Sequence, residues 1–321
     1  SRRSDFLGQN YFTPNDPLTV SQNASDSDNT GYSFSGDLLY RHRFGKRGRT
    51  VSLNVGTTAN DKSGEAYQFA QTRYFTGIDT TQTLDQQTIS ASDGFSLAPN
   101  LAYTEPIGKK GQIQINYSPS FNRSSSDRST NNLDTLSGEY SLPEFLLSSR
   151  FDNRVNTHRG GVSYNLRTEK VNFSVGLNFQ HVHLISEQTF PSAFSLDEKF
   201  RNVLPNVNFN YRASKAENLR IQYRSSTSVP SIGQLQNVLD NSNPLLLSIG
   251  NPLLKQPYGH SLTLRFNKSN AQKASNFLAY GYIGLTENYI ANSTFIALQD
   301  TVVLDNIPLP AGAQLTRPVN L

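Results

Sequence analysis

The chain has 321 residues, of which 36% are hydrophobic, and a mean hydropathy of −0.51. No run of 18 apolar residues occurs, so there is no candidate transmembrane helix, and the absence of cysteine excludes disulfides, thiolate metal sites and a cysteine nucleophile. The formal net charge is +4, but the basic residues gather at turns and not in a stripe with exposed aromatic rings, which argues against nucleic-acid binding.

The chain opens with Ser1-Arg2-Arg3-Ser4 directly into polar sequence and shows no signal peptide, so we expect a targeting segment upstream. Asp26, Asp28 and Asn29 resemble part of a calcium loop, but the glycine and the terminal glutamate of an EF-hand do not follow at the required positions. At the other end, residues 301–321 read as an unfinished loop. We therefore interpret the chain as an internal piece of a larger protein.

Short charged turns recur along the chain, separated by long polar stretches near residues 61–93, 124–155, 187–200 and 228–258. One end of each predicted hairpin is therefore short and the other long, which is typical of outer-membrane β-barrels with short periplasmic turns and long external loops. The five turns are Gly45-Lys46-Arg47-Gly48, Gly108-Lys109-Lys110-Gly111, Arg167-Thr168-Glu169-Lys170, Ser214-Lys215-Ala216-Glu217-Asn218 and Lys268-Ser269-Asn270-Ala271-Gln272-Lys273.

Alternation of apolar and polar residues between the turns predicts strands, because a period of two places the two sets on opposite faces. It is clearest over residues 171–179. The set expected to face lipid is Val171, Phe173, Val175, Leu177 and Phe179, and the set expected to face the lumen includes Asn172, Ser174 and Asn178.

Strand length separates a membrane barrel from a soluble β-sandwich, which also alternates. Soluble strands usually have about 5–6 residues, and a tilted strand needs about 9–11 to cross the hydrocarbon core. Strands of 12 to 16 residues are predicted at 31–44, 112–123, 156–167, 171–186 and 275–290. The predicted fold class is all-β, an antiparallel up-and-down transmembrane β-barrel whose walls rise beyond the bilayer.

Motifs for catalysis or metal binding are weak. His181 and His183 share a strand face and could hold one metal, but that face is the apolar one, which favours interfacial side chains over a metal site. No Gly-x-Ser-x-Gly elbow occurs, and the acidic pair Asp197-Glu198 lies in a predicted loop with no sign of an apolar pocket. We expect no catalytic residues, no cofactor and no metal, and hence no enzyme. Gly160-Gly161 is expected to let a strand bend or pack closely on its neighbour.

Residues 228–258 form the most distinctive stretch of the chain. Four prolines remove backbone donors and exclude a continuous ladder, Ser231 to Leu239 is the best short-helix candidate, and Gly250-Asn251-Pro252 predicts a turn. Six large aliphatic side chains between Leu245 and Leu254 are too apolar for a solvated loop. We expect the segment to be ordered on the barrel rim or in the lumen, with Ile232 and Leu235 packed beneath it. Rim closure is favoured over solute contact.

This stretch resembles the barrel of TonB-dependent outer-membrane receptors, especially the outer membrane protein beta-barrel type abundant in Bacteroidota. That type carries Pro-Ser-Ile-x-Gln-Leu, then Asp-Asn-Ser-x-Pro, then Gly-Asn-Pro-x-Leu-Lys-x-x-Tyr, and Tyr103-Thr104-Glu105-Pro106-Ile107 before a lysine-rich turn is also similar to the family. The matching positions, which we call the rim-loop motif, are Pro230, Ser231, Gln234, Leu235, Asn243, Pro244, Gly250, Asn251, Pro252, Leu254 and Tyr258.

The resemblance implies a barrel of about 22 strands, of which the five hairpins supply about ten. We therefore expect residues 1–321 to be part of one outer-membrane barrel domain, with the plug domain and the closing strands absent from this chain. Polar residues on the inward face are expected either to contact a plug or solute or to form a solvated wall. The candidates are Arg41, Arg43, Asn116, Asn178, Arg220 and Arg224.

Three functional hypotheses follow. The first is a barrel segment of a TonB-dependent-receptor-like transporter that takes up an unidentified solute across the Gram-negative outer membrane. The second is a structural, secretion-associated or adhesion barrel that does not transport, and the third is a soluble β-rich extracellular binding domain. For the first hypothesis the expected partners are membrane lipid, lipopolysaccharide, the TonB complex through the missing plug and a surface lipoprotein, with no nucleic acid.

Overall fold

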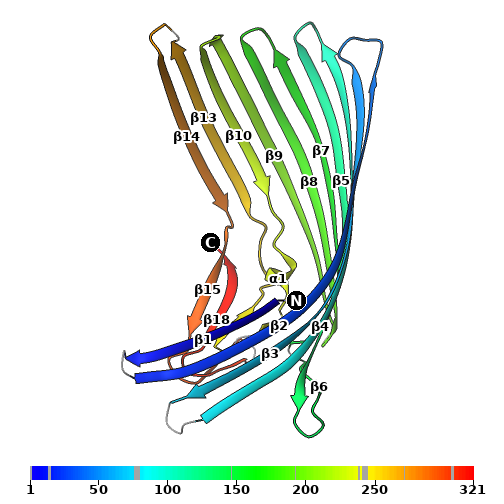
Figure 1. Cartoon of the computed structure of the whole chain (residues 1–321). Coiled ribbons are helices and arrows are strands. Elements are labelled where there is room, and N and C mark those ends of the chain that lie inside the picture. The colour runs from blue at the N-terminus through cyan, green and yellow to red at the C-terminus, as the bar shows by residue number, and fades with distance from the viewer. Residues whose placement is uncertain are drawn as a thin grey trace.

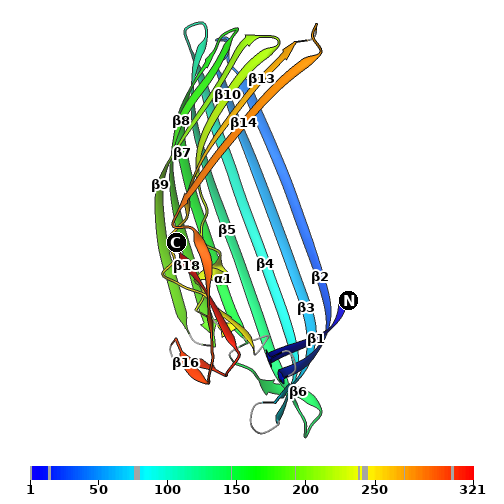
Figure 2. The same ribbon diagram turned by 90° about the vertical axis from the view of Figure 1, so that its left-hand side faces the viewer.

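In the computed structural model, one large antiparallel sheet curves around a central space, and smaller elements lie within the curve (Figures 1 and 2). The structure describes residues 2–13, 16–75, 80–145, 147–191, 193–237, 239–240, 245–270, 272–304 and 307–321. The strand order is β1-β2-β3-β4-β5-β7-β8-β9-β10-β13-β14, and β6 pairs with β5 outside this path. Neighbours in sequence are neighbours in space, so the predicted up-and-down topology is confirmed.

The wall strands are β1 (Arg2–Thr13), β2 (Asp16–Arg43), β3 (Thr50–Tyr74), β4 (Thr80–Ile107), β5 (Gly111–Asp134), β6 (Glu139–Pro143), β7 (Ser149–Arg167), β8 (Val171–Phe190), β9 (Phe194–Ser214), β10 (Glu217–Thr227), β13 (Tyr258–Asn270) and β14 (Ser275–Glu287). The inner elements are α1 (Ile232–Leu235), β11 (Leu239–Asp240), β12 (Leu246–Ile249), β15 (Ile290–Ile296), β16 (Thr301–Val303), β17 (Ile307–Leu309) and β18 (Gln314–Asn320). None of the described helices is long and apolar enough to cross a membrane.

All five predicted turns lie at the same edge of the sheet, the upper edge in Figure 1. They join β2 to β3, β4 to β5, β7 to β8, β9 to β10 and β13 to β14. The longer connections lie at the opposite edge. The short-turn edge is therefore the periplasmic side of the wall and the other edge is the external side.

Strand boundaries differ from the sequence prediction in three places. The polar stretches near 61–93, 124–155 and 187–200 are mostly strand, because β3 and β4 pair without interruption from Thr50↔Thr104 to Tyr74↔Thr80. Beyond the bilayer both faces of a strand can be wet, so apolar alternation is not needed there. The first 30 residues add β1 and lengthen β2, which gives eleven strands on the main path where ten were counted. Residues 301–321, predicted as a loop, contain β16, β17 and β18.

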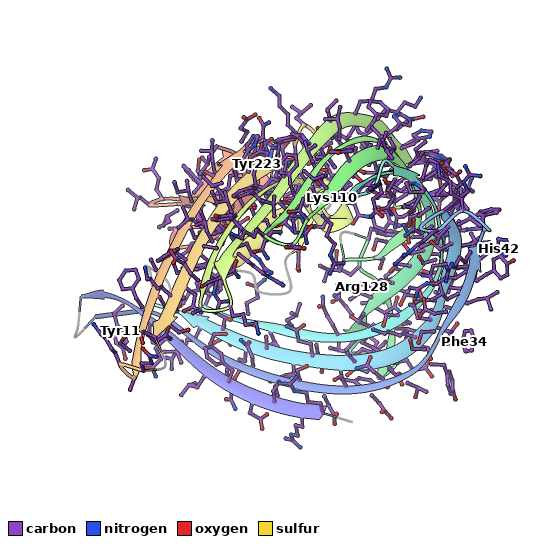
Figure 3. All side chains as sticks on the ribbon, turned by 90° about the horizontal axis from the view of Figure 1, so that it is seen from above. Tyr11, Phe34, His42, Lys110, Arg128 and Tyr223 are labelled. Carbon is purple, nitrogen blue, oxygen red and sulfur yellow. The ribbon has the colours of Figure 1, made fainter. Side chains whose placement is uncertain are left out.

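The two faces of the wall differ in chemistry as the alternation predicts. Viewed from above, Phe34 and His42 lie on the convex side and Arg128 lies within the curve (Figure 3). On β8, Val175, Leu177 and Phe179 are 39–51% exposed on the convex face, whereas Gln180, of the opposite parity, is buried on the concave face. The convex face of the wall is therefore the lipid face and the concave face lines the lumen.

The apolar stretch of β8 matches the thickness of a membrane. Residues 171–179 span about 27 Å along the strand and about 20 Å along the membrane normal at a tilt near 40°. The apolar band of such barrels is about 25 Å tall. His181 therefore lies at the external boundary of the band, and the polar extensions of β2 to β5 project beyond it.

Gly161 lets the inner face of the wall pack closely. A Cβ atom at this position would lie 3.0 Å from Asn116 Oδ1 and closer still to Asn178 Oδ1. Gly161 pairs with both residues, Asn116 on β5 and Asn178 on β8. The sequence expectation of close packing at Gly160-Gly161 is met at Gly161, where the two amide side chains occupy the space above the glycine.

The Tyr103–Ile107 motif at the end of β4 is tied to a neighbouring periplasmic turn. Glu105 accepts hydrogen bonds from Lys46 Nζ at 2.6 Å, Arg49 Nε at 2.7 Å and the Tyr103 hydroxyl at 2.6 Å. Lys46 belongs to the first charged turn, and Arg49 directly follows that turn and precedes β3. The motif therefore links the β2–β3 turn to the end of β4.

Substituting one residue on each face tests the assignment of faces. Val175→Arg should destabilise the protein by about 2–4 kcal/mol, because a cation would enter the apolar band near its middle. Ser174→Arg should have a smaller effect, since its side chain points into the polar lumen. Unfolding in lipid vesicles measures both, and equal losses of stability would contradict the assignment.

Candidate functional site

After β10 the chain leaves the wall and enters the concave side, beginning with a capped helical turn. The Ser231 backbone N–H donates to Gln234 Oε1 at 2.9 Å, and the Gln234 N–H lies 3.3 Å from Ser231 Oγ. This reciprocal pair is a capping box with Ser231 as the N-cap. The predicted helix within 231–239 is confirmed, although it is limited to Ile232–Leu235.

A small apolar cluster anchors the segment to the wall. Leu235 of α1 and Leu254 are 1% and 5% exposed, and they pack with Leu184 of β8 and Leu196 of β9. Gln256 adds a polar link, because Asn202 of β9 donates to its Oε1 at 2.6 Å. The segment is therefore held against the inner surface of β8 and β9 and not on the outer edge of the barrel.

The Gly250-Asn251 turn joins three parts of the chain. The Asn251 N–H donates to the Gln234 carbonyl at 2.6 Å, and its side-chain amide donates to the Pro318 carbonyl of β18 at 3.0 Å. Arg317 donates to Asn251 Oδ1 at 3.2 Å. A Cβ at Gly250 would lie 2.9 Å from the Gln234 carbonyl oxygen. Glycine is therefore required for the close approach of this turn to α1.

A four-stranded sheet in the order β11-β12-β18-β15 completes the inner structure. Its buried side chains are Leu247, Ile249, Ala297, Leu309, Ala313 and Leu315. β12 and β18 run parallel although they are far apart in sequence. Sequence reasoning missed this sheet, because its strands are short and residues 301–321 carry no clear alternation; the buried aliphatic residues of 245–249 were the available signal.

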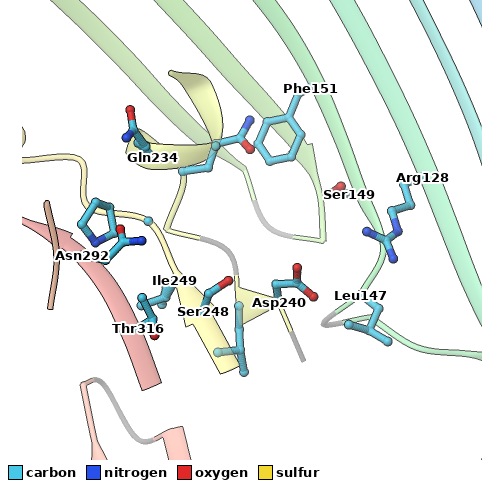
Figure 4. Close-up of a pocket in the computed structure, with 15 residues that line it drawn as sticks. Arg128, Leu147, Ser149, Phe151, Gln234, Asp240, Ser248, Ile249, Asn292 and Thr316 are labelled. Atoms are coloured by element: carbon cyan, nitrogen blue, oxygen red, sulfur yellow. The ribbon is translucent and has the colours of Figure 1, made fainter. Parts of the chain in front are cut away.

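A cavity of about 390 Å³ lies between the wall and the inner structure (Figure 4). Arg128, Ser149 and Phe151 line it from the wall, and Gln234, Asp240, Ser248, Asn292 and Thr316 are among the inner residues that line it. Arg128 Nε is buried without a hydrogen-bond partner in the part of the chain that the structure describes. The size falls within the usual range for small-molecule sites, and the lining offers a guanidinium, a carboxylate and several amide and hydroxyl groups.

The structure brings most of the rim-loop motif together. Pro230, Leu235, Gly250 and Leu254 are buried, Gln234 lines the cavity, and Tyr258 starts β13 with its hydroxyl donating to the Val203 carbonyl. Pro252 is half-buried beside Asn251. Asn243 and Pro244 lie outside the described residues. The expected burial of the aliphatic side chains holds for Leu247, Ile249 and Leu254 but fails for Leu246 and Leu253, which are 56% and 82% exposed.

The six lumen candidates all share the concave face by strand register. Asn178 and Arg224 line a second, polar cavity of about 440 Å³, together with Arg159. Asn116 lies beside Asn178 across Gly161. Arg220 pairs with Asn210 and Arg265. Arg41 and Arg43 lie at the end of β2, on the other side of the lumen from this cavity.

Two titratable side chains outside the cavities, His183 and Tyr140, have local partners. His183 Nε2 lies 2.8 Å from Asp197 Oδ1 on the convex face, and no cluster of three metal-ligating side chains occurs among the described residues. On the external extension, burial and then the hydrogen bond to Asp85 raise the pKa of Tyr140 to about 12. Tyr140 therefore stays protonated and ties β6 to β4.

These features define a wall segment of an outer-membrane β-barrel that carries an inward-folded segment. Residues 42–308 match the model of the Outer membrane protein beta-barrel family, and the chain belongs to this family. The protein is accordingly located in the Gram-negative outer membrane.

Solved structures are similar to the chain at low sequence identity. The hemophore receptor HasR of Serratia marcescens, in complex with its hemophore HasA and heme, is 12% identical with a TM-score of 0.49 over 99% of this chain and 53% of that chain. The alcaligin receptor FauA of Bordetella pertussis is 12% identical with a TM-score of 0.43 over 99% and 53%. The copper transporter OprC is 10% identical with a TM-score of 0.48 over 95% of this chain and 53% of that chain. The chain spans about half the length of each. No curated protein matches it.

Two leucines in the segment test the anchoring cluster. Leu254→Ala should destabilise the inner segment by about 2–5 kcal/mol, because it removes a buried side chain and leaves a cavity. Leu253→Ala is the matched control, since the neighbouring side chain is 82% exposed. Limited proteolysis within 228–257 should accelerate strongly in the first variant and little in the second; equal rates would show that the cluster does not hold the segment.

Two glycines test the close approach of the turn to α1. Gly250→Ala should destabilise the segment by about 1–3 kcal/mol, since the new Cβ would meet backbone oxygen atoms that have little room to move. Gly233→Ala, within α1, meets nothing within 4 Å and should be neutral or slightly stabilising. Thermal unfolding measures both, and an unchanged midpoint for Gly250→Ala would contradict the geometry.

Proposed function

We propose that the chain forms the barrel wall of a TonB-dependent-receptor-like transporter that takes up a hydrophilic solute. The observation that carries this proposal is the cavity between the wall and the inner structure, on the external side of the band. An uptake receptor needs an external site that is polar, partly enclosed and continuous with a wet lumen. The guanidinium of Arg128, with its unpartnered Nε, is the group best suited to contact such a solute.

The two edge strands of the wall support the proposal of a larger transporter. β1 and β14 end the strand order, and β14 exposes large side chains on both faces, including Tyr280 and Ile283 at 66% and 68%. Edge strands with apolar faces favour pairing with further strands. We infer that such strands complete one barrel domain. In the proposed transporter a plug would occupy the lumen and contact TonB, and a surface lipoprotein would be a further partner.

Uptake can be tested in cells starved for nutrients. A deletion strain that lacks the protein and the same strain complemented with the gene are given labelled sugars, peptides and metal chelates in turn. One class should accumulate less in the deletion strain, and a protonophore should abolish the difference, because transport of this kind draws on inner-membrane energy. An unchanged accumulation of every class would favour a structural, secretion-associated or adhesion barrel instead.

Point variants connect the transport to the cavity. Arg128→Ala should raise the solute concentration for half-maximal uptake about tenfold, the effect of losing one charged hydrogen bond. Arg150→Ala is the matched control, because Arg150 lies on the adjacent strand but points to the convex face and pairs with Asp127 at 2.6 Å. Equal effects of the two substitutions would place the solute elsewhere.

A further inference from the structure

The convex face of β5, β7, β8 and β9 carries a group of basic side chains directly above the apolar band. We call this group the cationic patch; its members are Arg123, Arg154, His158, His181, Lys199 and Arg201. We propose that the cationic patch binds the phosphate groups of a phosphorylated glycolipid in the outer leaflet of the membrane. Such binding takes place on the lipid face of the wall and is therefore independent of solute uptake through the lumen.

Strand register brings these side chains together. Arg123 pairs with Arg154, and His158 pairs with His181, which in turn pairs with Arg201. Lys199 lies opposite His183, in the row between the Arg123–Arg154 pair and the His158–His181–Arg201 row. Neighbouring strands are about 4.8 Å apart and alternate residues along a strand about 6.8 Å apart, so four strands and three rows span about 14 Å in each direction. That area suits a head group with more than one phosphate.

The charges of the patch are accessible and only partly neutralised. The side chains of Arg123 and Lys199 are 62% and 54% exposed. Arg123 lies 3.5 Å from Asp152, and Lys199 lies 3.7 Å from Asp197. Among the described residues no ion pair involves Arg154 or Arg201, both of which are exposed. A phosphate placed beside either arginine would therefore meet uncompensated positive charge.

The depth of the patch is fixed by the aromatic residues beneath it. Phe179 ends the apolar series on β8, and His181 follows it on the same face. The Tyr117 hydroxyl lies 2.7 Å from His158 Nδ1, and the two rings stack at an angle of 16°. Tyrosine rings favour the headgroup level of a membrane. The patch therefore lies at the level of the outer-leaflet head groups.

The rows of residues that contain the cationic patch continue across β4, β3 and β2, where their convex positions carry no positive charge. Arg123 pairs with Phe95 of β4, which pairs with Ala59 of β3, which pairs with Phe34 of β2. The next row outward on β3 and β4 carries the opposite sign, at Asp61 and Asp93. A general preference for basic residues at the interface would have placed them on β2–β4 as well, so their presence on β5–β9 and absence from β2–β4 point to a specific occupant.

Retention of glycolipid by the protein purified from outer membranes tests the proposal. The protein is exchanged into micelles that contain lipopolysaccharide with or without its glucosamine phosphates, and native mass spectrometry counts the bound molecules. The wild type should retain the phosphorylated form at least tenfold better. Arg154→Ser with Arg201→Ser should lower the affinity for it about 30-fold, at about fivefold for each cation near a membrane surface.

Two controls separate binding from folding. Arg150→Ser removes a cation from the same strand and face, four residues from Arg154 and already paired with Asp127, and should leave retention unchanged. The Arg154→Lys with Arg201→Lys variant keeps the charge and should stay within about threefold of the wild type. Equal retention of the two lipid forms, or an equal loss in Arg150→Ser, would overturn the proposal.

Discussion

The whole structure depends on one constraint: within lipid, each backbone N–H and C=O must find its partner inside the protein. The antiparallel ladder meets this constraint for most of the wall, with pairs running from Thr19↔Tyr74 to Arg43↔Thr50 between β2 and β3. Proline threatens such a ladder because it has no N–H. Between β4 and β5 the pairing is interrupted at Pro99 and Pro119, which lie opposite each other. Placing both prolines at one point confines the missing donors to a single gap, and Ser118 bridges it on the inner face by donating to Asn100 at 2.9 Å.

The inner segment is free of this constraint because it borders the lumen and not lipid. Its turns, prolines and short helix satisfy their backbone groups one by one, through the capping box at Ser231 and the contacts of Asn251 and Asn320. The entropy of ordering such a segment must be offset by burial, which the Leu235–Leu254 cluster and the inner sheet provide. The cavity forms where these two apolar clusters leave a polar seam against the wall.

Sequence reasoning identified the features that rest on local rules. Alternation and turn chemistry fix which residues of β8 face lipid and which edge holds the short turns, since both depend on neighbours in the chain. Sequence reasoning did not predict the external extensions of β3 and β4, because a strand that is wet on both faces shows no apolar period. The sheet of β11, β12, β15 and β18 escaped it for another reason: its pairing joins residues such as Leu247 and Leu315 that are remote in sequence. No local pattern records such a contact.

Strand β8 shows how the surroundings of a strand determine which of its faces is apolar. On β8 the convex residues are apolar up to Phe179 and then become His181 and His183, while the concave residues are polar up to Gln180 and then become Val182 and Leu184. The apolar face therefore changes sides at the membrane boundary. Below it the apolar partner is lipid, outside the wall; above it the apolar partner is the inner segment, inside the wall. Val182 and Leu184 are 0% and 1% exposed for this reason. The membrane boundary of the strand thus coincides with the level at which the inner segment begins to pack against the wall, which explains why the cavity lies above the apolar band and the polar lumen below it.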